Sequence, residues 1–294
     1  MTHVATLISN SGALDSSLVE QARGILAGAG VPHQLGPNAT DIPFSAEKAG
    51  DQRALSECLR ELSAGLDVVL QPAANRRKKL FLADMDSTMI GQECIDELAD
   101  YVGLKEHVAA ITDRAMRGDI AFEPALRERV ALLRGMPAKV IDEVIDQRIK
   151  LASGARTLIA TMRANGTLTC MVSGGFTLFT SRIATMIGFD ETRANTLVLD
   201  GDKLAGSVAE PIFGREAKRA TLVSLRTRLG IGKHETLVAG DGANDLDMIL
   251  EAGLGVAYHA KPKVAAAAPA RIDHSDLTAL LYVQGYRQSE FEVV

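Results

Sequence analysis

The chain has few of the side chains that build disulfide frameworks and zinc sites. Its 294 residues include only 3 cysteines and 6 histidines. The cysteines Cys58, Cys94 and Cys170 lie far apart, and no two histidines have the spacing of a His-x-x-x-His pair. A disulfide scaffold and a zinc centre with paired ligands are therefore not expected.

Long apolar runs and an excess of positive charge are also missing. No uninterrupted apolar stretch reaches the roughly 18 residues of a membrane span, and no basic segment followed by an apolar core opens the sequence. The 37 acidic and 32 basic residues give a formal charge of −5. Because nucleic acids and anionic membranes bind clustered Lys and Arg, neither is an expected partner. The expected location is the cytoplasm.

The first part of the chain predicts a small domain over residues 1–72. Asp15 is expected to cap a helix, a second helix is expected over 51–63, and strands are expected over 5–9 and 67–71. The resulting β-α-β-β-α-β order is typical of a ferredoxin-like α+β fold. The polar stretch 73–79, which is rich in Lys and Arg, is interpreted as a solvated linker.

Residues 80–294 follow a different pattern, in which apolar strands alternate with helices as in an α/β domain with a parallel sheet. Strands expected over 80–83, 167–172 and 236–239 all end in turns of small and polar residues. Ligands bind beyond the carboxyl ends of such strands, so these turns are expected to form one site. The helical insertion at 92–150 is expected to cap that site.

Two of these turns are acidic. Asp84 and Asp86 are two residues apart, so in extended backbone their side chains point the same way. The second acidic turn spans residues 240–245. Neither is a calcium loop, because Met89 and Leu246 occupy the positions where that loop needs glycine. Carboxylates at neighbouring turns suit Mg²⁺, which keeps positions open for water and phosphate.

The third turn, residues 173–175, joins a hydroxyl to two glycines ahead of a helix. It is not the elbow of a serine hydrolase, because residue 171 is Met rather than Gly. Ser173 and the neighbouring amides can donate to an anion, or Ser173 can act only as a helix cap. A cation for phosphate is expected from Lys218, Arg215 or Arg219, unless these lie on a solvated helix face.

Taken in order, the motifs resemble those of the haloacid dehalogenase-type phosphatases. The four motifs are Asp84-x-Asp-x-Thr, Ser173, Lys218 and Gly240-Asp-Gly-x-x-Asp245. A more detailed set resembles the phosphoserine phosphatase family over residues 80–286: Asp84-x-Asp-Ser-Thr-x-Ile90, Glu93, the stretch 122–133 and Val172-Ser-Gly-Gly-Phe176. Residues 1–72 loosely resemble the amino-acid-binding ACT fold.

The resemblance implies a fold and a reaction. The expected fold is a Rossmann-like parallel sheet core with a helical cap insertion, preceded by the small α+β domain. The expected reaction is Mg²⁺-dependent hydrolysis of O-phospho-L-serine to L-serine and phosphate through an aspartyl-phosphate, as the last step of serine biosynthesis. Met85, where many relatives have Phe, is expected to alter packing rather than activity.

The resemblance also implies roles for individual residues. Asp84 is the expected nucleophile, and Asp86 the expected acid and base. Mg²⁺ is expected on the side chains of Asp84 and Asp241 and on the backbone carbonyl of Asp86. The other expected site residues are Ser173, Gly174, Lys218 and Asn244 at the phosphoryl group, Glu93 at the ammonium, Arg129 at the carboxylate, Met116 and Phe122 as apolar walls, and Asp245 supporting the metal or Lys218.

Other interpretations remain open on the sequence. By spacing alone, Glu93 fits a helix N-terminal acid and Arg129 a surface ion pair. A related phosphatase or phosphotransferase, acting for example on phosphohomoserine, would share the core. A non-enzymatic amino-acid sensor is disfavoured by Asp86, because a stable phosphorylated switch does not benefit from its own hydrolysis. The expected partners are the small-molecule substrate and a second copy of the chain in a homodimer.

Overall fold

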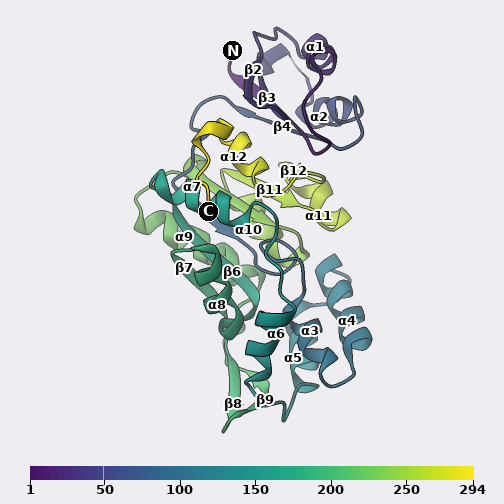
Figure 1. The fold of residues 1–294 in the computed structure, drawn as a ribbon, viewed down its shortest axis with the longest axis vertical. Coiled ribbons are helices and arrows are strands. Elements are labelled where there is room, and N and C mark those ends of the chain that lie inside the picture. The colour runs from purple at the N-terminus through teal and green to yellow at the C-terminus, as the bar shows by residue number, and fades with distance from the viewer. Residues whose placement is uncertain (49) are drawn as a thin grey trace. The chain divides into compact units, whose positions relative to one another are not determined.

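The computed structural model describes residues 1–48 and 50–294. Contacts within the chain divide it into two compact units (Figure 1). Unit 1 consists of residues 1–79, 153–167 and 270–294, and unit 2 of residues 80–152 and 168–269. Among the described residues, none of the helices is both long and apolar enough to cross a membrane.

Unit 1 is built on an antiparallel sheet of four strands in the order β2-β3-β1-β4. The expected β-α-β-β-α-β order is confirmed, and Asp15 caps α1 by accepting the amide of Ser17 at 3.0 Å. The helices and strands of unit 1 are β1 (His3–Ser9), α1 (Ser16–Ile25), β2 (His33–Gly36), β3 (Ala39–Phe44), α2 (Gln52–Arg60), β4 (Leu66–Pro72), α7 (Ala155–Ala164), β12 (Ala270–Ile272) and α12 (Ala279–Val283).

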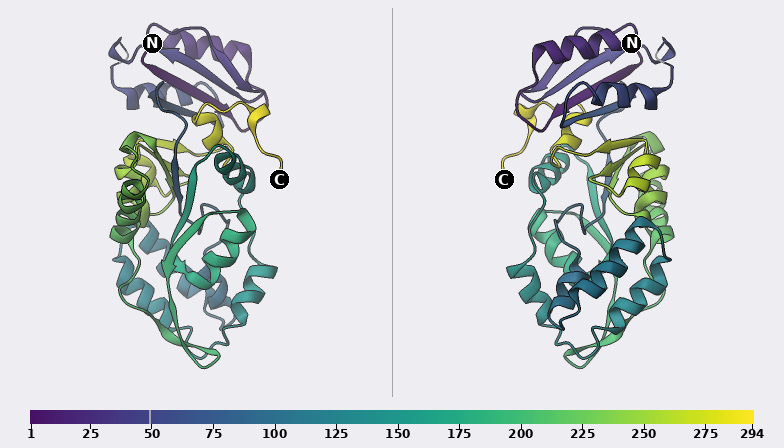
Figure 2. Two further views of the ribbon diagram at one scale, coloured as in Figure 1. Left: turned by 90° about the vertical axis from the view of Figure 1, so that its left-hand side faces the viewer. Right: turned by 90° about the vertical axis from the view of Figure 1, so that its right-hand side faces the viewer.

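The two helices α1 and α2 cover one face of this sheet (Figure 2). Leu7, Ile42 and Val68 point to that face from three strands and pack against Ala22 of α1 and Leu59 of α2. All five side chains are fully buried. Alternation along the strands directs the three strand residues to this face, where the apolar sides of the two helices cover them. This apolar layer is the core of unit 1.

The basic stretch 73–79 belongs to unit 1 and is not uniformly solvated. Arg76 forms a two-pronged ion pair with Asp41 and also donates to the backbone carbonyl of Val283. Its side chain is only 14% exposed, and Lys78 is buried. The interpretation of a solvated stretch is therefore wrong for these two residues. The domain limits expected from the sequence stay predictions.

Unit 2 contains a parallel sheet in which β11, β10, β5, β6 and β7 lie side by side in that order. Leu82, Val172 and Val238 of its central strands pack with Leu222 of α9 (Arg215–Arg228) in a fully buried core. The strands β5, β10 and β11 are fully buried and mostly apolar because helices cover the sheet, whereas the edge strand β7 is polar and partly exposed. The α/β class is confirmed. The strands of this sheet are β5 (Leu80–Ala83), β6 (Leu168–Phe176), β7 (Glu191–Asn195), β10 (Thr236–Gly240) and β11 (Leu254–Tyr258).

The helices of unit 2 fall into two groups. The expected helical insertion is confirmed by α3 (Cys94–Asp100), α4 (Lys105–Arg117), α5 (Phe122–Ala131) and α6 (Val140–Gln147), which we call the cap. The other helices are α8 (Thr177–Ile187), α9 (Arg215–Arg228), α10 (Leu246–Glu251) and α11 (Pro262–Ala267).

A β-hairpin of unit 2 supports the cap and was not expected from the sequence. It consists of β8 (Leu197–Asp200) and β9 (Lys203–Val208). The amide and carbonyl of Leu204 pair with Met136 and Gly135, which follow α5, with both hydrogen bonds at 2.8 Å. Figure 2 shows the hairpin beside the cap helices, so the cap is attached to the core at more than its two ends.

Candidate active site

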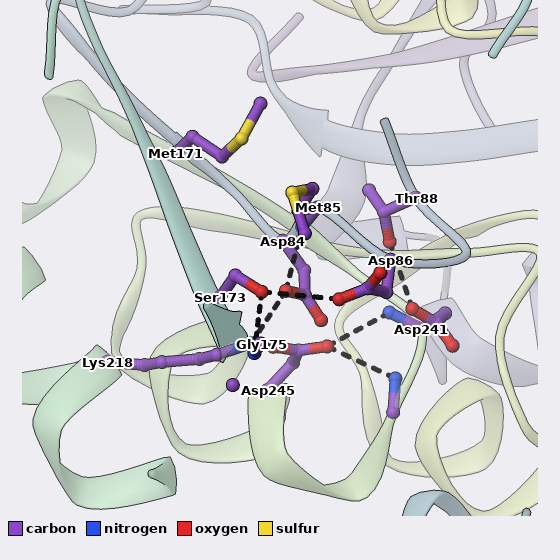
Figure 3. A network of polar contacts seen from close by, with 12 residues as sticks. Asp84, Met85, Asp86, Thr88, Met171, Ser173, Gly175, Lys218, Asp241 and Asp245 are labelled. Carbon is purple, nitrogen blue, oxygen red and sulfur yellow. Dashed lines mark hydrogen bonds and ion pairs between the residues drawn. The ribbon is translucent and has the colours of Figure 1, made fainter. Parts of the chain in front are cut away.

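Three neighbouring parallel strands of unit 2 end at one edge of the sheet and carry the three polar turns (Figure 3). The central strand β5 pairs with β10 on one side and β6 on the other. The amide of Asp84 donates to the carbonyl of Ala239 at 3.0 Å, which keeps the turn after β5 in register with the end of β10. The strand order thus brings together turns that lie far apart in the sequence.

A buried lysine joins two of these turns. Lys218 of α9 has no exposed surface, and its Nζ lies 2.8 Å from Asp84 Oδ1 and 2.7 Å from Asp245 Oδ1. Burial alone would lower the pKa of Lys218, but the carboxylates of Asp245 and Asp84 outweigh burial and raise that pKa. The other two candidate cations, Arg215 and Arg219, form exposed ion pairs elsewhere.

Three carboxylates gather around this lysine. One oxygen from each of Asp84, Asp241 and Asp245 lies within 4.8 Å of the others, and all three residues are buried. The second oxygen of Asp245 accepts the amides of Asp241 at 3.2 Å and Gly242 at 3.1 Å. Thr88 donates its hydroxyl to Asp241 at 3.0 Å. Buried oxygen donors of this kind suit a hard divalent cation.

The excess of negative charge contributes to raised pKa values of the carboxyl groups in this cluster. Burial, followed by the charge of Asp245, raises the pKa of Asp84 well above its usual range, although Lys218 opposes this shift. The same two causes raise the pKa of Asp241 to about 7. A bound cation would relieve this repulsion, so the donor set and its charge both fit a metal site.

Asp86 makes hydrogen bonds of its own and is not one of these three carboxylates. Its Oδ1 accepts the amide of Cys94 at 2.9 Å, and its Oδ2 accepts the hydroxyl of Ser173 at 3.3 Å. Burial raises the pKa of Asp86, while the hydrogen bonds from Cys94 oppose the shift. A Cβ on Gly175 would lie 3.0 Å from Asp86 Oδ2, so glycine keeps this approach open.

An enclosed cavity connects the strand ends with the cap. Its free volume is about 20 Å³, which holds about one water molecule. An organic phosphate is larger than this free volume, so side chains that line the cavity would have to move to admit one. The cavity is lined by Asp84, Asp86, Glu93, Ile95, Met116, Phe122, Leu126, Arg129, Gly174, Gly175, Phe176 and Asn244.

The cap supplies two groups of opposite charge to this cavity. Glu93 occupies the N-cap position of α3, but its side chain makes no capping hydrogen bond and instead accepts the hydroxyl of Ser87 at 2.7 Å. Burial and the charge of Asp86 raise the pKa of Glu93 well above its usual range. Arg129 of α5 is 2% exposed and lines the cavity. The interpretation of Arg129 as a surface ion pair is therefore wrong.

The apolar walls depend on glycines opposite them. A Cβ on Gly174 would lie 2.6 Å from the ring of Phe122, and a Cβ on Gly242 would lie 2.8 Å from the sulfur of Met116. Both approaches require glycine unless the opposing side chain moves. The two glycines thus let cap side chains approach the last residues of β6 and the turn after β10 directly. The strand β6 includes residues 173–175, which were expected to form a turn after it.

The amide side chain of Asn244 is aimed at the same cavity. Asn244 is 5% exposed and lines the cavity, and within the described part of the chain its Oδ1 has no hydrogen-bond partner. Gly174, which also lines the cavity, is fixed through its carbonyl, which accepts the amide of Asn195 at 2.8 Å. Asn244 therefore presents an unpaired side-chain oxygen to the cavity.

The structure brings every expected site residue into this region and adds others. Ser173, Lys218, Asp241 and Asp245 join the cavity through the contacts above. Sequence reasoning assigned no role to Ser87 or Thr88, although both stand inside the recognised motif and contact Glu93 and Asp241. Ile95 and Leu126, which line the cavity, could not be distinguished from ordinary core residues of amphipathic helices.

Comparison with known proteins finds relatives among phosphoserine phosphatases and haloacid dehalogenase family hydrolases. A phosphoserine phosphatase of a Polaromonas species is 45% identical over 208 residues, covering 69% of this chain and 88% of that protein. The crystal structure of a haloacid dehalogenase family hydrolase from Salmonella enterica serovar Typhi matches with a TM-score of 0.84 at 30% identity, covering 96% of this chain and 98% of the other.

A third relative bears on the chemistry. A phosphoserine phosphatase solved as an analogue of its phospho-aspartyl intermediate matches with a TM-score of 0.67 at 37% identity, covering 70% of this chain and 98% of the other. The family model described as haloacid dehalogenase-like hydrolase matches residues 81–250. The chain therefore belongs to the haloacid dehalogenase-like hydrolase family.

Proposed function

We propose that the chain hydrolyses O-phospho-L-serine to L-serine and phosphate with Mg²⁺, as the last step of serine biosynthesis. One observation carries the proposal: a single cavity brings Asp84 and its partner Lys218 together with Glu93 and Arg129 of the cap. The three charged groups of phosphoserine would each lie near a group of opposite charge: the phosphate near Lys218, the ammonium near Glu93 and the carboxylate near Arg129. The phosphoserine phosphatases among the relatives support this substrate.

Asp84 is the proposed nucleophile. Its carboxylate attacks phosphorus, the bond to the serine oxygen breaks, and Asp84 carries the phosphoryl group until water removes it. Lys218, 2.8 Å from Asp84, balances negative charge on the carboxylate and the incoming phosphate. Ser173, Gly174 and Asn244 would contact the phosphoryl oxygens through hydroxyl, backbone amide and side-chain amide donors.

Asp86 is the proposed acid and base. Its raised pKa favours the protonated form, which gives a proton to the departing serine oxygen. The carboxylate that results takes a proton from the water that attacks the aspartyl-phosphate. The amide of Cys94 holds Asp86 Oδ1 in place for both steps. The hydroxyl of Ser173, which donates to Asp86 Oδ2 in the free chain, would turn to the phosphoryl group when substrate binds.

Mg²⁺ would be held by the side chains of Asp84 and Asp241 and by the backbone carbonyl of Asp86. When bound, Mg²⁺ offsets the repulsion between an anionic nucleophile and an anionic phosphate. Asp245 supports this arrangement by orienting Lys218 and the amides of Asp241 and Gly242. Both oxygens of Asp245 are engaged in these contacts, whereas Lys218 pairs with Asp84 through Oδ1, so we assign Asp245 a supporting role rather than that of a ligand.

Substrate choice would lie in the cap. Glu93 takes the ammonium group, which replaces repulsion from neighbouring carboxylates with attraction. Arg129 takes the carboxylate through a forked pair of N–H groups. Met116 and Phe122 exclude water around the phosphoryl group when the cap is closed.

A substrate panel tests the proposal. Phosphate release with Mg²⁺ is measured for O-phospho-L-serine, phosphohomoserine, sugar phosphates and nucleotides. Phosphoserine is expected to have the highest specificity constant, because sugar phosphates and nucleotides lack both the ammonium and the carboxylate, and phosphohomoserine carries them one methylene further from the phosphate. A higher specificity constant for any of the others contradicts the assignment.

We also propose, on the sequence alone, a cytoplasmic location and a homodimer without nucleic-acid or membrane partners. Light scattering on the purified chain measures its mass in solution. A mass of one chain at assay concentration contradicts the homodimer.

A further inference from the structure

Arg129 is held in place by two hydrogen bonds inside the cap. Its Nε donates to the carbonyl of Ala125 at 3.0 Å, and its Nη1 donates to the hydroxyl of Thr112 at 2.8 Å. Both Arg129 and Thr112 are 2% exposed. These bonds use Nε and one Nη1 hydrogen, which leaves the end of the guanidinium that carries Nη2 for a ligand in the cavity.

Thr112 connects Arg129 to a carboxylate on another cap helix. Its hydroxyl lies 2.6 Å from Asp96 Oδ1 and 3.0 Å from the carbonyl of Val108. A hydroxyl has one hydrogen to donate, and the shorter contact to a charged acceptor is the stronger of the two. Thr112 therefore accepts from Arg129 and donates to Asp96, so α3, α4 and α5 each contribute one member of the chain of hydrogen bonds.

This chain of hydrogen bonds also couples the two substrate-binding groups of the cap. Asp96 lies in the first turn of α3, one turn after Glu93. Glu93 and Arg129 line the cavity, whereas Asp96 and Thr112 do not. A shift of α5 relative to α3 would change the separation of the ammonium and carboxylate sites, and the two bonds of Thr112 oppose such a shift.

We propose that Thr112 and Asp96 are positioning residues that hold Arg129 for a substrate carboxylate and so set the preference for phosphate monoesters that carry one. This inference rests on the proposed function, which assigns the substrate carboxylate to Arg129. A free arginine side chain would lose much rotational freedom on binding. A guanidinium already fixed at Nε and Nη1 loses less, so its ligand binds more tightly.

Two substrates that differ only in the carboxylate test the proposal. O-Phosphoethanolamine keeps the phosphate and the ammonium of O-phospho-L-serine but lacks the carboxylate. Thr112→Val keeps the shape of the side chain and removes the hydroxyl, and Thr112→Ser keeps the hydroxyl. Thr180→Val is a matched control, because Thr180 is also a fully buried helical threonine in unit 2 and its described contact is with the carbonyl of Thr177.

Thr112→Val is expected to raise KM for phosphoserine about tenfold with little change in kcat, since one bond to a charged group is lost. The kcat/KM of this variant for phosphoethanolamine should stay within about twofold of that of the original chain. For Thr180→Val, kcat/KM should stay within the same limit for both substrates. Thr112→Ser should restore KM for phosphoserine. Asp96→Ala should have the same selectivity as Thr112→Val.

The outcomes separate this proposal from the one on which it rests. Equal losses on both substrates in Thr112→Val, or no loss on either, overturn the positioning role. Arg129→Met is measured in parallel and should weaken phosphoserine selectively. If Arg129→Met does not, the carboxylate assignment itself fails; if it does while Thr112→Val does not, only the positioning role fails.

Discussion

The two units each bury a cluster of charged side chains, and the clusters differ in their balance. In unit 1, Asp41 pairs with Arg76 and also accepts the hydroxyl of Thr6 at 2.7 Å, so one negative charge meets one positive charge. In unit 2, the three carboxylates Asp84, Asp241 and Asp245 lie together, and Lys218 forms ion pairs with two of them, so negative charge is in excess.

The difference separates a structural cluster from a functional one. A buried ion pair whose charges balance and whose oxygens accept hydrogen bonds holds one arrangement of the chain without a bound ligand. A buried cluster with an excess of one sign raises the pKa values of its own members and is stabilised by ligands of the other sign. The candidate active site of unit 2 thus has an excess of negative charge, and binding of a metal ion and of a substrate ammonium would reduce it.

The largest effect is expected from the functional cluster. Asp84→Asn should lower kcat by about 10⁴-fold, because an amide cannot serve as the nucleophile, while the circular dichroism spectrum stays unchanged. The measurement is phosphate release from phosphoserine at saturating Mg²⁺. Undiminished turnover in this variant would remove Asp84 as the nucleophile.

Breaking the balanced cluster should act on stability instead. Arg76→Met leaves Asp41 buried without its counter-charge and should lower the free energy of unfolding by about 3 kcal/mol. Turnover per folded molecule should not change. Urea denaturation followed by circular dichroism measures the loss. Arg77→Met is the control, because Arg77 is about half exposed and lies over the ring of Tyr286.

A double variant checks the cause of that loss. Asp41→Asn combined with Arg76→Met removes both charges and should recover most of the stability, since no buried charge is left unpaired. If the double variant is as unstable as the sum of the single variants, the ion pair is not what stabilises this part of unit 1.

A smaller effect is expected on the pH dependence of stability without metal. Asp241 has a pKa of about 7 in the folded chain against an ordinary value of 3.8. Between these values the folded state keeps a proton that the unfolded state has released, so stability falls as pH rises through this window. Asp84 and Glu93, whose pKa values are also raised, act in the same direction.

Thermal unfolding in chelator measures this effect. The melting temperature of the original chain minus that of Asp241→Asn should fall by a few degrees between pH 5 and pH 8, because the variant no longer titrates at this position. Adding Mg²⁺ at pH 8 should raise the melting temperature of the original chain more than that of the variant. If the difference between the two melting temperatures does not change with pH, the pKa of Asp241 is not raised in the folded chain.

The smallest effect is expected at Met85. This residue is fully buried, and Figure 3 shows its side chain directed away from the carboxylate of Asp84. Met85→Phe should therefore change kcat/KM by less than about twofold and act through packing, with a change in melting temperature as its main signature. A tenfold loss of kcat without a change in stability would contradict this interpretation.

The acidic turns of unit 2 were predictable because their placement depends on local rules. Each follows a short apolar strand, and the carboxyl ends of parallel strands meet at one edge of a sheet. The hairpin β8–β9 could also have been predicted, since Gly201 and Asp202 form a two-residue turn signal between alternating apolar residues. It was missed although the signal is present.

Other features depend on packing between distant parts of the chain. Lys218, Arg215 and Arg219 lie on one helix, and only the packing of α9 decides which of them is buried. Thr112 and Asp96 come from separate helices of the cap, and periodicity gives no information on their contact. In unit 1, Asp67 accepts the amide of Ser275 at 2.7 Å across 208 positions of sequence, which no local pattern predicts.

The most direct test is to locate the phosphoryl group during turnover. The chain is mixed with phosphoserine labelled in its phosphate, quenched rapidly in acid and digested, and the labelled peptide is identified by mass spectrometry. The label is expected on the peptide that contains Asp84, and Asp84→Asn should carry none. Label on another peptide, or rapid phosphate release with no labelled chain at any quench time, would contradict catalysis through Asp84.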